Sequence, residues 1–146
     1  MDNKGGFYIT QIKQLQDRIF EKLLFENGIP ISGAQERILS VLWQKDHMTI
    51  GEISKATSLA KNTVSIVVNG MVTKGILQRN CNPNNRRQAI VSLTDYARSI
   101  QQECKIASQQ MNEIFYAKFT KEEQLLFENY LTRILDTLIK AEHTNN

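Results

Sequence analysis

Hydrophobic residues recur with the period of an α-helix over most of this chain. Apolar side chains fall three or four positions apart over 7–26, and the Asn-Gly pair at 27–28, followed by Pro30, is a typical helix end. The next two predicted helices each begin with a capping box, a Ser or Thr followed three positions later by Gln or Glu, at 32–35 and 49–52. The first third of the chain is therefore predicted to be helical.

A further helix is predicted after a short break at 58–61, and it continues to Lys74. A short helix, a tight turn and a second helix make up a helix-turn-helix, whose second helix enters the major groove of DNA with its N-terminus first. Asn bonds adenine in bidentate fashion, Lys reaches guanine or phosphate, and hydroxyl groups serve base edges or backbone. We therefore expect DNA contacts from Lys61, Asn62, Thr63 and Ser65.

After Gly75 the pattern changes to the period of two that is typical of strands. Two strand-like runs between 78 and 94 flank an Asn-Pro-Asn-Asn turn at 82–85, which predicts a β-hairpin. Arg86 and Arg87 follow the turn directly, so they lie at the projecting end of the hairpin. Beside a helix-turn-helix such a hairpin forms a wing, and its arginines are expected in the adjacent minor groove, where A·T-rich segments concentrate negative potential.

The remaining helices are predicted at 95–118 and 121–142, and both are amphipathic. Together with the first helix they carry wider apolar stripes than one small domain can cover, which favours packing against a second copy of the chain. The predicted fold is mainly α with a small β-hairpin wing. It divides into an N-terminal dimerisation helix (1–28), a winged helix-turn-helix DNA-binding domain (31–94) and C-terminal dimerisation helices (95–146).

The net charge of +3 is unevenly distributed along the sequence. Seven Lys and Arg stand against only Glu52 and Asp95 over 50–98, a net +5, whereas 1–49 is neutral and 99–146 carries −2. A positive middle third is expected when one face of a protein meets a polyanion. No apolar run approaches the roughly 20 residues that cross a bilayer. The N-terminus also lacks the pattern of a secretory signal, so we expect a cytoplasmic protein with no membrane partner.

In these features the chain resembles the MarR family of bacterial winged-helix regulators over nearly its whole length. The matching motifs are I-S-x-x-Q at 31–35, T-I-x-E-I at 49–53, N-T-V-S at 62–65, K-G-I-L-x-R at 74–79, and N-P-N-N-R-R at 82–87 followed by L-T at 93–94. The resemblance implies a homodimer joined through the terminal helices that binds a pseudo-palindromic operator in double-stranded DNA and represses transcription. It also implies a small phenolic or lipophilic effector in a crevice beside the dimer helices, which we expect to be lined partly by Tyr8, Ile12 and Leu15.

Three sites depart from the pattern that is usual in that family. Asn85 stands where an acidic residue usually orients the wing, and Ile66 stands where the recognition helix often carries an arginine. Asn69-Gly70 replaces a common Asp-Arg pair. We therefore expect a more positive wing, and the base preference of the family does not carry over to this chain.

Other functions leave weaker signals in the sequence. The chain has no nucleophile elbow, phosphate-binding loop, zinc-protease motif or dinucleotide fingerprint, so we expect no enzymatic activity and no cofactor. His47 and His143 are isolated, which predicts no metal site. One alternative is a winged-helix module that binds a protein partner. Another is a thiol-based redox regulator using Cys81 or Cys104, with Cys81 the better candidate because it begins the hairpin.

Overall fold

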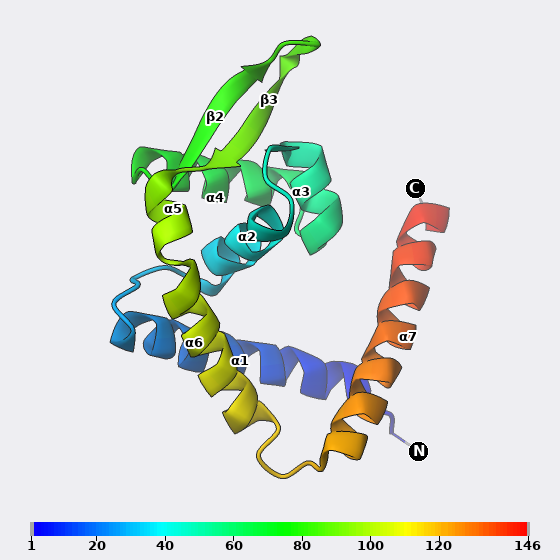
Figure 1. Ribbon diagram of the computed structural model, residues 1–146. Coiled ribbons are helices and arrows are strands. Elements are labelled where there is room, and N and C mark those ends of the chain that lie inside the picture. The colour runs from blue at the N-terminus through cyan, green and yellow to red at the C-terminus, as the bar shows by residue number, and fades with distance from the viewer. Residues whose placement is uncertain (1, 146) are drawn as a thin grey trace. The chain divides into compact units, whose positions relative to one another are not determined.

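The computed structural model describes residues 2–145, which form mostly helices and one small sheet (Figure 1). In chain order the elements are α1 (Gly5–Glu26), α2 (Gly33–Gln44), β1 (Met48–Thr49), α3 (Ile50–Thr57), α4 (Lys61–Thr73), β2 (Leu77–Asn82), β3 (Asn85–Leu93), α5 (Asp95–Ser99), α6 (Gln101–Phe115) and α7 (Lys121–Asn145). The chain forms two compact units, the first ending at Met111 and the second beginning at Asn112. The predicted fold class, mainly α with a β-hairpin wing, is confirmed.

Helices α2 and α3 begin at the capping boxes that the sequence predicts. Before α2, the Ser32 hydroxyl accepts a hydrogen bond from the Gln35 amide at 3.2 Å, and the Gln35 side chain accepts one from the Ser32 amide at 2.9 Å. The same reciprocal pair forms at 49–52 before α3 and at 120–123 before α7. Each box satisfies two amide groups that a helix start leaves without partners.

The sheet contains three antiparallel strands in the order β1-β3-β2. In the hairpin, Leu77 lies opposite Leu93 and Arg79 lies opposite Val91. The sequence predicted only these two strands. The third, β1, is two residues long and pairs Met48 with Val91, which is too short to produce an alternating pattern.

The prediction of one helix over 95–118 is wrong in two respects. First, the chain forms two helices there, α5 and α6, with a break at Ile100. The Ser99 hydroxyl donates a 2.6 Å hydrogen bond to the Tyr96 carbonyl at this break. Such a bond competes with the helical pattern of the backbone. In addition, α6 ends at Phe115, three residues short of the predicted end.

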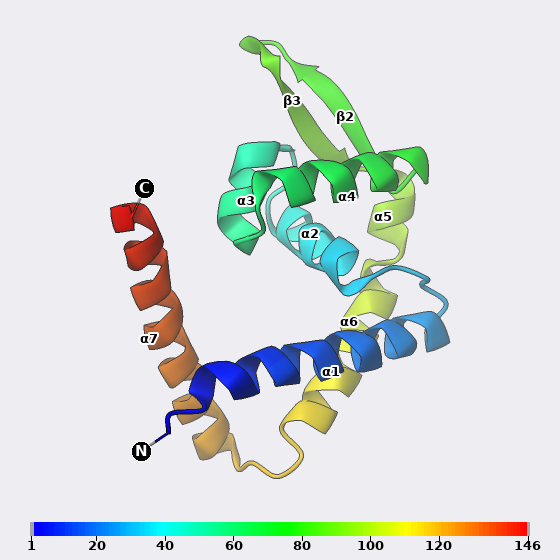
Figure 2. The same ribbon diagram turned by 180° about the vertical axis from the view of Figure 1, so that it is seen from behind.

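The hydrophobic core of the first unit joins α2, α3, α4 and the inner end of the hairpin to the C-terminal end of α1 and the first half of α6. Its fully buried side chains include Leu24, Ile38, Leu39, Leu42, Ile53, Val64, Val68, Met71, Val91 and Cys104. Trp43 is partly buried against this core, and its indole N–H donates to the Ala97 carbonyl at 3.1 Å. Figure 2 shows α4 passing across the base of the hairpin, so one core supports both elements.

The second unit has its own aromatic cluster, made of Phe115, Tyr116, Phe119 and Phe127 with ring centroids 4.9–6.3 Å apart. The Tyr116 hydroxyl donates to a Glu128 carboxylate oxygen at 2.7 Å. Burial and then this bond raise the pKa of Tyr116 to about 12. Between 2 and 145, no helix is both long enough and apolar enough to span a membrane.

Candidate nucleic-acid interface

Side-chain hydroxyls fix the turn between α3 and α4. The Ser54 hydroxyl donates to the Leu59 carbonyl at 2.6 Å, and the Thr57 hydroxyl accepts from the Leu59 amide at 3.2 Å. Between them Ser58 adopts the left-handed conformation, with φ of +61°. Short polar residues tolerate that region better than bulky ones, and their local hydrogen bonds set the direction in which α4 leaves the turn.

One side of α4 is buried and the other is open. Val64, Val68 and Met71 point into the core. Of the predicted contacts on this helix, Lys61, Asn62 and Thr63 are exposed, whereas Ser65 is half-buried on the flank. The exposed side also contains Ile66, Asn69, Gly70 and Thr73, which the sequence had not assigned to DNA. Three of the four predicted residues therefore lie on the open face of α4.

The wing turn is organised by its asparagines. The Asn82 side-chain oxygen accepts from the Asn84 amide at 3.0 Å, and the Asn85 side-chain oxygen accepts from the Arg87 amide at 3.1 Å. The strand register shifts at Cys81–Asn82, so that Asn82 pairs with Asn85 across the turn. A neutral side chain at Asn85 thus provides the local hydrogen bond without adding a negative charge.

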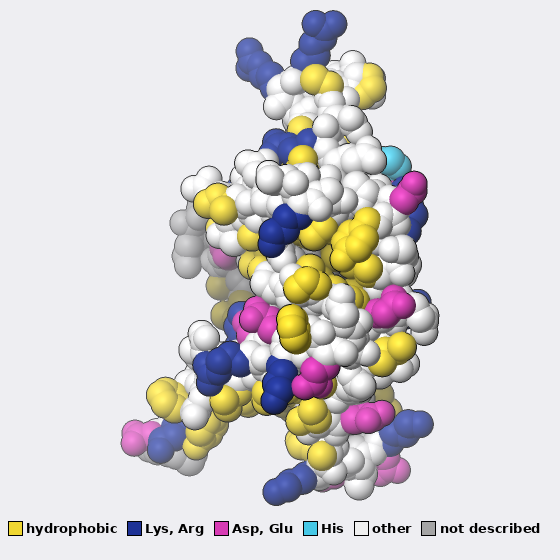
Figure 3. All heavy atoms as spheres, turned by 90° about the vertical axis from the view of Figure 1, so that its left-hand side faces the viewer, with side chains coloured by type: hydrophobic (Ala, Val, Ile, Leu, Met, Phe, Trp, Pro, Cys, Tyr) yellow, Lys and Arg dark blue, Asp and Glu magenta, His cyan; other side chains and the backbone are white. Residues whose placement is uncertain are grey.

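Arg86 and Arg87 are exposed just beyond this turn, as predicted. Figure 3 shows dark-blue side chains projecting from the top of the view, where the hairpin ends. No carboxylate among residues 2–145 forms an ion pair with either arginine. Their positive charges are therefore not neutralised by the protein.

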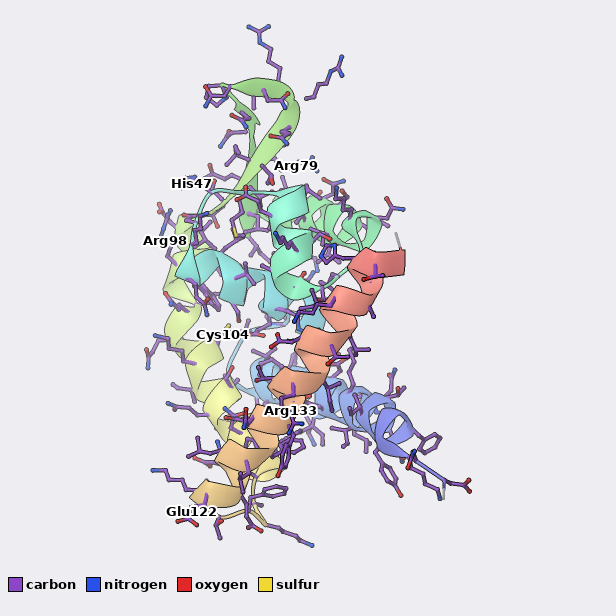
Figure 4. All side chains as sticks on the ribbon, turned by 90° about the vertical axis from the view of Figure 1, so that its right-hand side faces the viewer. His47, Arg79, Arg98, Cys104, Glu122 and Arg133 are labelled. Carbon is purple, nitrogen blue, oxygen red and sulfur yellow. The ribbon has the colours of Figure 1, made fainter. Side chains whose placement is uncertain are left out.

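A further arginine, Arg79, connects the wing to α4. Its guanidinium donates a hydrogen bond to the side-chain oxygen of Asn69 on α4. Figure 4 shows Arg79 at the base of the hairpin, on the exposed surface. Because Asn69 is neutral, the bond holds Arg79 in position but leaves its charge in place. The only sequence signal for this residue was its membership of the K-G-I-L-x-R motif.

Asp46 fixes the inner end of the wing to α5. Its carboxylate accepts bonds from the Leu93 amide at 3.0 Å, from the Arg98 guanidinium at 3.2 Å and from the His47 amide at 2.8 Å. The Thr94 hydroxyl adds a bond of 2.9 Å to the Ile76 carbonyl. Sequence reasoning missed Asp46, because two of its three partners, Leu93 and Arg98, lie about fifty positions away in the chain.

The predicted effector residues Tyr8, Ile12 and Leu15 lie on α1, where their exposed fractions are 53%, 42% and 45%. A separate surface pocket of about 290 Å³ lies between α2 and α6. Its lining includes Glu36, Ser40, Trp43, Gln101, Cys104 and Lys105. Burial raises the pKa of the Glu36 carboxyl, although a hydrogen bond from Ser40 and the charge of Arg37 oppose that effect.

The two cysteines are free and lie in different surroundings. Cys81 is exposed on β2, and Cys104 is buried in α6. Burial, with Glu36 and Glu103 nearby, raises the pKa of the Cys104 thiol to about 12. Because the thiolate is the reactive form, the buried thiol has little reactivity near neutral pH. Within the described chain no three His, Cys, Asp or Glu side chains come close enough together to hold a metal ion.

The amino-acid sequence of this chain is similar to those of known transcriptional regulators. A family model described as the MarR family matches residues 31–89. The multiple antibiotic resistance protein MarR of Escherichia coli is 25% identical over 131 residues, which cover 89% of this chain and 90% of that protein. The uncharacterized HTH-type transcriptional regulator YwhA of Bacillus subtilis is 22% identical over 127 residues, which cover 87% of this chain and 86% of that protein.

Solved structures agree in fold over most of the chain. A crystal structure of a cysteine-to-serine mutant of E. coli MarR, complexed with operator DNA, matches with a TM-score of 0.81 and 25% identity, over 89% of this chain and 92% of that one. The PcaV regulator of Streptomyces coelicolor, in complex with its natural ligand, matches with a TM-score of 0.82 and 19% identity. This match covers 93% of this chain and 96% of that one. At that lower identity the second match supports the fold alone.

Proposed function

Because this chain belongs to the MarR family of winged-helix transcriptional regulators, we propose that it binds a pseudo-palindromic DNA operator as a homodimer and represses transcription until a small effector releases it. The proposal assigns the DNA contacts to Lys61, Asn62 and Thr63 on α4 and to Arg86 and Arg87 on the wing. Ser65 is given a minor part at the edge of the groove, since it is half-buried. Such a regulator acts where the chromosome is, which we take to be the cytoplasm.

The observation that carries the proposal is the electrostatic character of the surface formed by α4 and the hairpin. Between Glu52 and Asp95 the sequence contains no acidic residue, and six Lys or Arg lie in that interval. Arg86 and Arg87 have no acidic partner among residues 2–145. A recognition helix with an open polar face beside a cationic hairpin fits the major groove and the adjacent minor groove of one DNA face.

A second copy of the chain is proposed as the partner of the terminal helices. The exposed apolar side chains on α1 are Phe7, Tyr8, Ile9, Ile12, Leu15, Ile19 and Phe25, and on α7 they are Leu125, Leu126, Tyr130, Ile134, Leu135, Leu138 and Ile139. Stripes of this length on soluble proteins usually mark protein interfaces. The domain division at 1–28, 31–94 and 95–146 remains part of this proposal. In a two-fold dimer the two recognition helices would be about 34 Å apart, one turn of DNA.

The effector is proposed to be a small phenolic or lipophilic molecule. Tyr8, Ile12 and Leu15 offer an aromatic hydroxyl beside aliphatic surface on α1, which suits such a ligand. PcaV, which shares this fold, was solved in complex with its natural ligand, and we extend ligand binding to the present chain only as part of the proposal. A two-state regulator responds to an effector only by as much as the ligand's affinities for the two states differ.

Two other functions make different predictions. A winged-helix module that binds a protein partner would not retard duplex DNA at moderate salt. A redox regulator would lose its response when Cys81 and Cys104 are replaced by serine. The low reactivity expected of Cys104 leaves Cys81 as the exposed thiol on which that alternative depends.

The proposal is tested by selecting fragments of the source genome that the purified protein binds. We expect a common sequence with two-fold symmetry, retarded by the protein in a gel at moderate salt and bound by two chains as measured by analytical ultracentrifugation. If no fragment is enriched and no duplex is retarded, the proposed function is wrong.

A further inference from the structure

Ile66 lies at the centre of the open face of α4, and 72% of its side chain is exposed. No other large hydrophobic side chain between 2 and 144 has a higher exposed fraction. The buried side of the same helix is fully covered, since Val64 and Val68 have no exposed surface. Ile66 therefore does not belong to the core of the chain, and its exposure in the isolated protein has a cost in free energy.

The neighbours of Ile66 on this face are small or polar. Residues three or four positions apart share one side of a helix, which places Asn62, Thr63, Asn69 and Gly70 around Ile66. A Cβ atom built on Gly70 would meet no atom within 4 Å, so nothing screens Ile66 from that direction. One apolar side chain in polar surroundings is too small a patch for a stable protein interface.

The chemistry of the major groove offers a partner of matching size. Thymine alone among the four bases presents a methyl group there, on C5, and apolar side chains contact it. Cytosine occupies the same position in a pair but has a hydrogen on C5 and an amino donor beside it. An aliphatic side chain between two asparagines thus complements a thymine methyl flanked by hydrogen-bonding base edges.

We propose that Ile66 contacts the C5 methyl group of a thymine in each operator half-site and selects thymine at that position. The inference rests on the proposed function, because it requires α4 to enter the major groove. It adds a neutral specificity contact to the polar contacts of Asn62 and the charged contacts of the wing.

Replacement of one thymine by uracil measures this contact, because uracil lacks only the methyl group. Burying one methyl-sized group is worth about 0.8 kcal/mol, so each substitution is expected to weaken binding roughly fourfold. Substituting the equivalent thymine in both half-sites is expected to weaken binding by roughly sixteenfold, since separate sites contribute additively. An uncharged contact leaves the salt dependence unchanged.

The experiment uses the full chain and short duplexes carrying the operator found by selection. Every thymine is replaced in turn by uracil, and the dissociation constant is measured for the natural protein, for Ile66→Ala and for Ile66→Val. We expect one thymine position per half-site at which uracil weakens the natural protein. Ile66→Ala should be insensitive to uracil at that position, and Ile66→Val should retain part of the sensitivity.

The controls separate this contact from folding and from the proposed function. Ile66→Ala removes no core contact, so its melting temperature should match that of the natural protein. Operator binding without any uracil-sensitive position, or with sensitivity that persists in Ile66→Ala, would overturn the contact while leaving the proposed function intact. Absence of operator binding by the natural protein would overturn both.

Discussion

The exposed guanidinium groups of the wing make a quantitative prediction about the salt dependence of DNA binding. Arg87 has its backbone fixed by Asn85, while its side chain is exposed and has no acidic partner within the described chain. Replacement by alanine should therefore remove one cation per chain without disturbing the turn. Any change in binding should then report the loss of a contact with phosphate.

The size of the effect follows from counterion release. Each phosphate neutralised contributes about 0.9 to the slope of log affinity against log salt concentration, so a dimer that loses two contacts should lose about 1.8 from its slope. As the salt concentration rises from about 50 to 200 mM, the ratio of the natural protein's affinity to that of Arg87→Ala should then fall by about twelvefold. Because phosphate contacts carry no sequence information, the loss should be similar for operators of different sequence.

The assay is a fluorescence-anisotropy titration of the operator duplex at several salt concentrations. Lys22→Ala is the matched control, since Lys22 is an exposed cation on α1 and lies outside the helix-turn-helix and the wing. We expect its slope to equal that of the natural protein. A slope for Arg87→Ala that also equals that of the natural protein would refute the placement of the wing arginine against phosphate.

Three further predictions address other parts of the chain. Asn62→Ala should relax preference at one base position, costing about 1–3 kcal/mol for the preferred base only; a uniform loss over all single-base variants would contradict base reading. Burial raises the pKa of Glu36 above its ordinary 4.5, so the folded state favours the protonated carboxyl. The folded protein therefore has its full stability from this group below pH 4.5 and loses it as the pH rises through the raised pKa. Glu36→Gln should therefore raise the melting temperature more at neutral pH than in acid, and an equal shift at both would contradict the linkage. A chain ending before Thr120 should be monomeric or insoluble in sedimentation experiments, whereas a well-behaved dimer would argue against the proposed interface.

The features predicted correctly from sequence are those determined by neighbouring residues. The box at Ser32–Gln35 needs only a hydroxyl and an amide three positions apart, and the turn at 82–85 needs only the local preferences of Asn and Pro. Both appear in the structure where the sequence placed them. The exposure of Arg86 and Arg87 follows from the same local argument.

The features that were missed depend on contacts between distant segments. The strand β1 exists because Met48 and Thr49 meet β3, and two residues have no periodicity of their own. The hydrogen bonds from Leu93 and Arg98 to Asp46 likewise join residues that are far apart in sequence. Ile66 is absent from the predicted contacts for another reason: an apolar side chain on a helix normally indicates a core position, and only the fold shows that this one is exposed.

The departures from the family pattern have one physical consequence when they are considered together. Asn85 and Asn69 keep local hydrogen bonds to the Arg87 amide and the Arg79 guanidinium, but neither asparagine neutralises an arginine. Ile66 and Gly70 leave the middle of α4 without positive charge. The cationic contacts are thus concentrated on the hairpin, and the middle of the recognition helix is left with neutral ones. Salt should therefore weaken the contribution of the wing while sparing that of Asn62 and Ile66, so the preference among operator sequences should persist at salt concentrations that reduce overall affinity.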